Sequence, residues 1–587
     1  MALFTPSASP AVTVKEIDLT GVVPNVQTST GAFVGDFGWG AAGEVTLVSN
    51  EAGLVSTFSA PTTSNTVDFH SAAYFLKYSN SLYIVREVDS DAKNAIGSNS
   101  NATTAVAQQI KNRDAFDALA AFDSADGSFL AKYPGELGNS LRVSVCVQDS
   151  AGTTFDTWAY KSSFDRAPGT SSFASALGAS KDEIHIAVID KDGGISGTVG
   201  TVLETFPHVS VATNAKSTDG ASNYYKDVLK EKSSWVYAGQ LYIGDSAGSS
   251  DTIGTNWDTA ATIAGEDFSA GMTDVSTRTD TWDFDSGVNS SAIGTDDILR
   301  GFDKFEDKDN IEVDFLIAPE SLTKSAATTV VNDLVATATA RKDCVVVASP
   351  DRAAVVTAAT TASVITTTDT YTSSSYLFVD NNYLKVFDKY NDQYIKIPAA
   401  SSTAGLMAAT DLVAAPWFSP AGQRRGNYLG VTDIILQPTK TDRDTLYKAG
   451  VNPVANIPGQ GILLFGDKTK MNRPSAFDRI NVRRLFLAIE RAIEIAGKNV
   501  MFEFNDEFTR AEFVNIVEPF LREVQGRRGI TDFRVVCDET NNTPAVVDRN
   551  EFIASIFIKP ARSVNYVTLN FVAVRTGVDF EEVTGTV

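Results

Sequence analysis

A glycine pattern is the most suggestive chemical feature of this sequence. Residues 34–44, VGDFGWGAAGE, contain the spacing G-x-G-x-x-G at Gly38, Gly40 and Gly43. Dinucleotide-binding loops use this spacing, with a strand before the glycines and a helix that begins within them to hold the pyrophosphate. Here residues 44–49, EVTLVS, follow the glycines and are typical of a strand. The pattern therefore predicts a tight turn between two strands, with Trp39 available for packing.

Two other short motifs each lack a required residue. Residues 461–469, GILLFGDKT, resemble a P-loop, but that loop needs lysine directly after its second glycine, where this chain has Asp467. A carboxylate there would occupy the place of the phosphate oxygens. Residues 190–193, DKDG, resemble the start of a calcium loop but lack the later glycine and glutamate of an EF-hand. We therefore assign neither site and interpret residues 190–193 as a solvated turn.

Histidine is too scarce for most hydrolytic or zinc chemistry. The chain has three histidines, at 70, 185 and 208, and none beyond. His185 alternates within a strand-like run, where a hydrogen-bonded structural histidine is expected. No pair among the 72 acidic residues stands out from a solvated surface. The three widely spaced cysteines, Cys146, Cys344 and Cys537, are an odd and sparse set and indicate no disulfide framework. The sequence therefore predicts no catalytic, cofactor-binding or metal site.

The bulk composition excludes other classes of function. A chain of 587 residues predicts two to four domains. The formal net charge of −23 argues against non-specific binding to nucleic acid or anionic membranes, which reward clustered Lys and Arg. No apolar run approaches the roughly 20 residues that span a bilayer, and the start, MALFTPSASPAV, is too rich in Pro and Ser for a signal peptide.

Hydrophobic periodicity predicts three structured regions along the chain. A helix near 68–78 and strands at 82–88, 141–147 and 183–189 favour a β-rich first region with antiparallel sheet, whereas 89–105 and 245–300 are expected to be surface loops. Strand 311–319, helix 321–340 and strand 343–349 predict a βαβ unit on a parallel sheet.

The last 120 residues predict a compact α+β domain with two helices on a sheet. Apolar residues lie on one face of helices around 482–493 and 513–524. Strands are expected at 500–505, 531–539, 551–559 and 564–574. Residues 11–17 and the tail after Gly577 alternate like strands but have no obvious local partner.

Several long strings in the sequence resemble one protein family. They are PSAFDRINVRRL at 474–485, FEFN at 502–505, FTR at 508–510, VCDETNNT at 536–543 and IFIKPAR at 556–562, with YPGELG at 133–138, DKYND at 388–392 and SPAGQRRG at 419–426 upstream. Together they resemble the tail sheath proteins of contractile-tailed (myovirus) bacteriophages over nearly the whole chain.

The resemblance implies a multi-domain chain of α/β and α+β regions. The expected divisions are an N-terminal arm at 1–22, a β-rich outer region at 23–220, a subtilisin-like α/β region without a catalytic triad at 221–465, a compact C-terminal α+β domain at 466–576 and a C-terminal arm at 577–587. Large phage sheaths often carry a protruding domain inserted after the strand that matches Val88. Because 89–112 reads as a short loop, we expect that insertion to be missing or vestigial.

The resemblance also implies a structural subunit rather than an enzyme, with no cofactor. Such subunits stack in rings that wind helically around the tail tube and contract to drive the tube through the host envelope. The implied partners are further copies, the tail tube protein, the baseplate and the tail terminator, without nucleic-acid binding or membrane insertion, in a virion tail assembled in the host cytoplasm. The alternatives are the sheath of a non-phage contractile injection system and a ligand-binding α/β enzyme.

The strand-like arms are the candidate assembly elements. We expect them to exchange with the C-terminal domains of neighbouring subunits through Ala11, Val12, Thr13, Val14, Lys15, Glu16, Ile17, Val578, Phe580 and Val583. Gly21 and Gly577 are the expected hinges. Candidates for inter-subunit charge contacts are Arg483, Arg484, Arg527 and Arg528, and a solvated helix face is the alternative for each.

Overall fold

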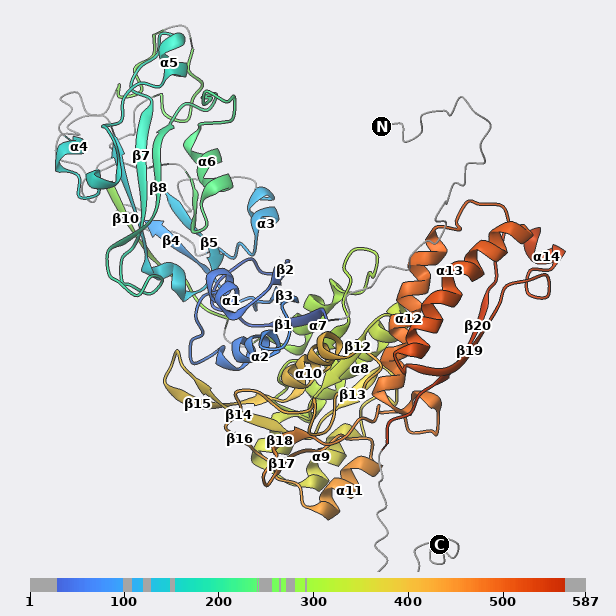
Figure 1. The fold of residues 1–587 in the computed structure, drawn as a ribbon. Helices are drawn as coiled ribbons and strands as arrows, with labels where there is room; N and C mark the ends of the chain where they lie inside the picture. The colour runs from blue at the N-terminus through green and yellow to red at the C-terminus, as the bar shows by residue number, and fades with distance from the viewer. Residues whose placement is uncertain are drawn as a thin grey trace, which may run out of the picture. The chain divides into compact units, whose positions relative to one another are not determined.

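The computed structural model describes residues 29–98, 108–119, 128–147, 154–239, 241, 256–262, 265–270, 280–290 and 293–564. These residues divide into two compact units, whose helices and strands carry the labels of Figure 1. The larger unit contains described residues of 29–414 and 420–478, and the smaller contains 415–419 and those of 479–564.

A six-stranded sheet forms the centre of the larger unit. Its order is β13-β12-β11-β1-β3-β2, and every neighbouring pair is parallel except β3 with β2. The strands are β1 (Gly31–Gly35), β2 (Val45–Val48), β3 (Leu82–Arg86), β11 (Phe315–Ile317), β12 (Val345–Ala348) and β13 (Leu377–Val379). The parallel strands are short apolar runs that are almost entirely buried, as expected for strands covered on both faces.

Helices supply the cover for this sheet. They are α1 (Glu51–Phe58), α2 (Thr66–Leu76), α7 (Thr295–Asp303), α8 (Lys324–Arg341), α9 (Thr361–Thr368) and α10 (Ala400–Val413). The helix predicted near 68–78 corresponds to α2. The predicted βαβ unit is also confirmed, since α8 connects the parallel strands β11 and β12 and packs its apolar residues into the same core.

A second, antiparallel sheet of seven strands lies between β3 and α7 in the chain. Its order is β8-β7-β6-β10-β4-β5-β9. The strands are β4 (Asn94–Ser98), β5 (Phe129–Pro134), β6 (Leu141–Val147), β7 (Glu183–Asp190), β8 (Thr201–Ser210), β9 (Val236–Ala238) and β10 (Asp280–Asp285), with short helices α3 (Arg113–Asp117), α4 (Thr154–Thr157), α5 (Ser172–Ala176) and α6 (Tyr225–Lys232). This confirms the predicted antiparallel region around 141–189.

The topology corrects two predictions about this part of the chain. The division at residue 220 is wrong, because β1 and β3 belong to the parallel sheet with β11. The interpretation of 89–112 as a short loop is also wrong: Asn94–Ser98 is β4, between β10 and β5, and the chain after Val88 builds the antiparallel sheet before it returns to the parallel one. Local composition could not reveal these pairings, since the partners are far apart in the sequence.

The glycine pattern at 38–43 forms a turn between β1 and β2, as predicted. Gly40 and Gly43 have positive φ angles of 101° and 72°, which glycine adopts without strain. Trp39 is buried against Tyr133 and Trp235, with ring centroids 5.4 and 5.1 Å away. The turn therefore serves packing, and the strand β2 stands where a dinucleotide loop would need a helix.

A buried guanidinium joins this turn to the antiparallel sheet. The three nitrogens of Arg86 donate hydrogen bonds of 2.7 Å each to the carbonyl oxygens of Phe37, Gly40 and Pro134. Pro134 ends β5, whereas the other two carbonyls belong to the β1–β2 turn. Since unsatisfied buried carbonyls are costly, this one side chain of β3 stabilises both the β1–β2 turn and the end of β5.

Two smaller sheets and one further helix complete the larger unit. They comprise β14 (Tyr383–Asp388), β15 (Gln393–Pro398) and β16 (Asp433–Ile434), the hairpin of β17 (Val454–Ile457) and β18 (Gly461–Leu464), and α11 (Lys440–Lys448). The P-loop look-alike therefore begins in a hairpin strand. The next α-helix in the chain starts only at Ile480, so no helix N-terminus follows the glycines.

The smaller unit is an α+β arrangement built on two long helices. Its elements are α12 (Ile480–Lys498), α13 (Glu507–Gly526), β19 (Ile530–Val536), α14 (Pro544–Val547) and β20 (Ser555–Pro560). Leu485 and Ile489 of α12 pack with Phe513, Val517 and Leu521 of α13, which confirms the two predicted amphipathic helices. The strand expected at 500–505 is wrong, because these residues form the turn between the helices; the one expected at 564–574 lies outside the described residues apart from Val564.

Buried carboxyl groups give the larger unit a predictable pH dependence. Burial raises the pKa of Asp380, which accepts a 2.9 Å hydrogen bond from the Ser349 hydroxyl, to about 7. The folded state therefore binds a proton that the unfolded state releases between about pH 4 and pH 7, so stability falls as pH rises through that window. Asp380→Asn should flatten the fall by up to about 1.4 kcal/mol per pH unit.

Urea unfolding of wild type and Asp380→Asn at pH 5, 6, 7 and 8 measures this difference. The exposed Asp309→Asn serves as the matched control and should follow the wild-type curve. Parallel pH profiles for wild type and Asp380→Asn would contradict the assignment.

Candidate inter-subunit interface

The predicted arm and hinge residues cannot be placed. Residues 11–17, Gly21, Gly577, Val578, Phe580 and Val583 all lie outside the described residues. The candidate interface is therefore sought among the described residues of the smaller unit.

The four predicted contact arginines separate into two pairs. Arg483 and Arg484 are 8% and 4% exposed, so neither is a surface charge of this subunit. The reason is local: residues 480–485 of α12 are all buried, which leaves no solvated face in its first turns. Arg527 and Arg528 are exposed at the end of α13, and their role as inter-subunit contacts stays a prediction. Arg527 lies 5.2 Å from the Trp417 ring and 3.6 Å from Glu523.

The β-sheet of the smaller unit has open edges. β19 and β20 pair antiparallel with each other, with Phe533 opposite Ile558 and Val535 opposite Ile556. These four side chains pack against the core formed by α12 and α13. Within the part of the chain that the structure describes, neither strand has a second neighbour. An exposed strand edge offers unpaired N–H and C=O groups to another strand.

The turn between α12 and α13, together with the first turn of α13, carries an exposed group of large apolar side chains, called here the aromatic tip. It consists of Met501, Phe502, Phe504 and Phe508. Phe502 is fully exposed and has a φ of +71°, a left-handed conformation that is a genuine outlier for a bulky residue. Such strain persists only where surrounding contacts impose it, and it clusters at functional sites.

A network of polar side chains holds the aromatic tip in place. The Asn505 amide donates to the Glu551 carbonyl at 2.8 Å and to Asn542 Oδ1 at 3.2 Å. Arg510 Nε donates to Asn505 Oδ1 at 2.7 Å. Asn542 in turn exchanges two hydrogen bonds with the Ile553 backbone, at 2.8 and 2.9 Å. The neighbouring strings FEFN and FTR thus meet VCDETNNT, which lies further along the chain.

The sequence predicted a strand in place of this turn, because the apolar and polar residues of FEFN alternate as they do in a strand. A usable signal was present: Asp506 accepts a hydrogen bond from the Thr509 backbone amide as the N-cap of α13. Asp is a favoured N-cap residue directly before a helix. Recognising it would have left too few residues between the helices for a paired strand.

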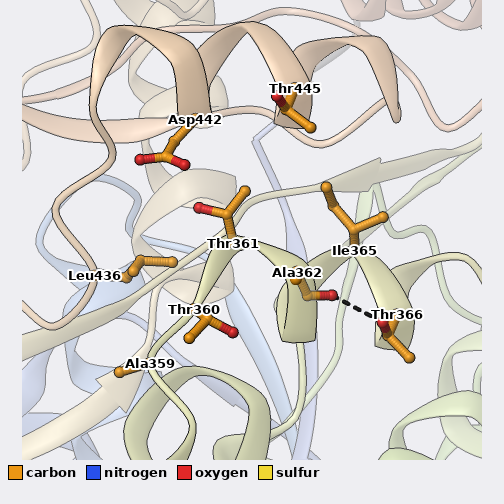
Figure 2. Close-up of a pocket in the computed structure, with 9 residues that line it drawn as sticks. All are labelled: Ala359, Thr360, Thr361, Ala362, Ile365, Thr366, Leu436, Asp442 and Thr445. Atoms are coloured by element: carbon orange, nitrogen blue, oxygen red, sulfur yellow. Dashed lines mark hydrogen bonds between the residues drawn. The ribbon is translucent and has the colours of Figure 1, made fainter.

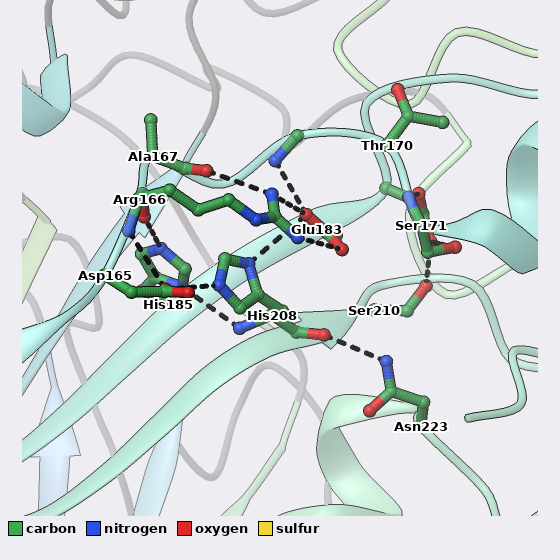
Figure 3. Close-up of polar contacts among 12 residues, drawn as sticks. Asp165, Arg166, Ala167, Thr170, Ser171, Glu183, His185, His208, Ser210 and Asn223 are labelled. Carbon is green, nitrogen blue, oxygen red and sulfur yellow. Dashed lines mark hydrogen bonds and ion pairs between the residues drawn. The ribbon is translucent and has the colours of Figure 1, made fainter. Parts of the chain in front are cut away.

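Figure 3 shows a cluster of polar contacts in the antiparallel sheet whose histidines are held by structural hydrogen bonds. His185 Nε2 donates to the Arg166 carbonyl at 2.7 Å, while its Nδ1 accepts from the His208 amide at 3.1 Å. Burial lowers the pKa of His185 to about 4, so the ring stays neutral. His208 lies 2.8 Å from Asp165 and 3.3 Å from Glu183. His185 is thus the hydrogen-bonded structural histidine that the sequence predicted.

A histidine–aspartate pair also occurs in the larger unit. His70 Nε2 lies 3.1 Å from Asp388 Oδ1, and both side chains are buried. Asp388 also accepts hydrogen bonds from Thr66 and Asn391, which hold the pKa of Asp388 well below its usual range although burial alone would raise it. Among the described residues, no serine, threonine or cysteine side chain is hydrogen bonded to His70, so the pair lacks the nucleophile of a triad.

An open groove of about 720 Å³ lies beside α9 and α11 (Figure 2). Its lining consists of Ala359, Thr360, Thr361, Ala362, Ile365, Thr366, Leu436, Asp442 and Thr445. The single ionisable group, Asp442, caps α11 by accepting from the Thr439 backbone amide at 3.0 Å. The groove therefore brings no pair of titratable groups together.

The described part of the chain offers two further observations. It contains no grouping of three His, Cys, Asp or Glu side chains that could hold a metal ion. None of its helices is long and apolar enough to cross a membrane.

Comparison with known proteins identifies relatives over nearly the whole length. Family models described as phage tail sheath protein central domain and phage tail sheath C-terminal domain match residues 291–470 and 472–573. The tail sheath protein of Enterobacteria phage T4 is 32% identical over an alignment 673 positions long, which covers 98% of this chain and 99% of the relative. That of Vibrio phage KVP40 is 30% identical over 98% of this chain.

Solved structures agree at the level of the fold. The crystal structure of a sheath tail protein from Listeria innocua has a TM-score of 0.52 at 11% identity, covering 92% of this chain and 98% of that one. One from Desulfitobacterium hafniense has a TM-score of 0.50 at 12% identity, with 94% and 100% coverage. The multi-domain, mixed α/β architecture is thus shared. On the near-full-length identity above all, this chain belongs to the phage tail sheath protein family.

Proposed function

We propose that this chain is the repeating structural subunit of a contractile tail sheath. In this role, copies polymerise helically around a tail tube and rearrange collectively to drive the tube through the host envelope. The observation that carries the proposal is the 32% identity to a phage tail sheath protein over 98% of the chain. The partners would be further copies, the tube protein, the baseplate and the tail terminator, in a virion tail assembled in the host cytoplasm.

The edges of the β19–β20 hairpin, which no described strand covers, supply a route to polymerisation. An extended segment from another subunit can add to such an edge through main-chain hydrogen bonds. Residues 11–17 and the tail after Gly577 have the alternating composition for this role. An arm that leaves one subunit and joins the next makes a heterologous contact, and heterologous contacts that do not close generate helical assemblies.

Contraction then needs no chemistry within the subunit. Compact units can move as rigid bodies between an extended and a contracted lattice while the arms, hinged near Gly21 and Gly577, keep neighbours connected. The buried polar clusters support a non-enzymatic role, since His70, His185 and Asp388 are occupied by structural contacts. We further infer that the parallel α/β region keeps a subtilisin-like arrangement without its chemistry.

The sheath of a non-phage contractile injection system is the remaining alternative. Its subunit would use the same assembly mechanism, so purified protein would behave alike in both cases. Neighbouring capsid and terminase genes favour a phage, and their replacement by effector genes would favour the alternative.

Truncation of the arms tests the polymerisation route. Removal of residues 1–20, or of the last ten residues, should leave a folded subunit because the two cores described above lie outside both segments. Neither truncated protein should form tubes under conditions in which the full chain forms hollow striated tubes by negative-stain electron microscopy.

Circular dichroism and thermal unfolding serve as controls for folding. Truncated proteins that are folded and still polymerise like the full chain would refute arm exchange. A full chain that remains monomeric under all tested conditions would refute the sheath function itself.

A further inference from the structure

The aromatic tip of the smaller unit has an acidic surround. Glu503, Asp506 and Glu507 are exposed between and beside the phenylalanines. Asp506 is occupied as the N-cap of α13. Among the described residues, Glu503 and Glu507 have no ion-pair partner, so their charges are available to another molecule.

The opposite end of the same unit is basic and also carries apolar surface, and is called here the basic end. Arg527, Arg528 and Arg562 are exposed there, and Val564 is 80% exposed. Within the described part of the chain, neither Arg528 nor Arg562 forms an ion pair. In a chain with a formal net charge of −23, an exposed group of arginines is a distinctive feature.

The course of the chain places the two groups at opposite ends of α13. At the tip, Asn505 bonds to Asn542 and to the Glu551 carbonyl, residues that lie between β19 and β20. At the basic end, where β19 begins and β20 ends, the Ala561 amide donates to the Gly529 carbonyl at 3.1 Å. A helix of 20 residues separates the two ends by about 30 Å.

We propose that the acidic aromatic tip of one copy docks on the basic end of the next copy. Charge complementarity identifies the occupant: the tip presents carboxylates around an apolar centre, and the basic end presents guanidinium groups beside Val564. Arg–carboxylate pairs favour planar, bidentate contacts. Because the two surfaces differ and lie at opposite ends, the contact is head-to-tail and open, so it propagates along a polymer. This proposal rests on the proposed function, because it requires that copies of the chain polymerise.

Charge reversal in the full chain tests this contact. Glu503→Lys/Glu507→Lys and, separately, Arg528→Glu/Arg562→Glu should each raise the critical concentration for polymerisation about tenfold or more, because like charges then face each other. Combining all four substitutions in one chain restores opposite charges and should bring the value back toward wild type. Sedimentation of polymer from monomer measures each value.

Asp219→Lys/Asp309→Lys, at two exposed carboxylates outside the smaller unit, is the matched control and should polymerise like wild type. Single-end reversals that polymerise normally, or a four-fold variant no better than either pair, would overturn the contact while leaving the sheath function intact. A wild-type chain that forms no polymer would overturn both.

The substitution Phe502→Gly distinguishes a role of Phe502 in docking from a role in the fold of its own subunit. Glycine adopts the +71° φ of this position without strain, so thermal unfolding should occur at the same temperature as in wild type or higher. Loss of the exposed ring should nevertheless raise the critical concentration severalfold. A lower unfolding temperature with normal polymerisation would contradict the docking role of Phe502.

Discussion

The two-stranded sheet of β19 and β20 is the constraint on which the account of this protein depends. A lone two-stranded hairpin is marginal in water, and here α12 and α13 stabilise it by covering one face. Within the described residues its outer edges have no partner strand. The features around it are exposed as well: Phe502 of the aromatic tip has a positive φ angle, and Arg528 forms no ion pair with a described residue. The surface of the smaller unit is therefore suited to contacts with neighbouring subunits.

The larger unit has the opposite character. Several of its buried polar groups are satisfied within the chain: Arg86 binds three carbonyls, Asp388 accepts hydrogen bonds from Thr66 and Asn391 and lies beside His70, and His185 uses both ring nitrogens. Groups that are fully hydrogen bonded in this way fix geometry and leave little for catalysis. A larger unit held by these internal contacts and a smaller unit with an exposed aromatic tip fit the family to which the chain belongs.

Much of the local structure was predictable from the sequence, because apolar periodicity determines amphipathic helices such as α12 and α13. The turn at Gly40 was predictable for a similar reason, since the residues after it alternate like a strand. The placement of β1 beside β11 was not predictable, because two strands that are so far apart in the sequence carry no local signal of their pairing. Burial of Arg483 and Arg484 was missed because periodicity identifies one buried face, whereas the first turns of α12 are buried all round. At the tip, the left-handed Phe502 depends on tertiary contacts of Asn505.

The most direct test of the account is a helical reconstruction, by electron cryomicroscopy, of polymers formed by the full chain. Arm exchange predicts an open helical lattice in which an extended segment from one subunit continues the β19–β20 sheet of another as an added strand. A lattice of closed rings without strand exchange, or terminal segments that fold back onto the β19–β20 edges of their own subunit, would contradict it.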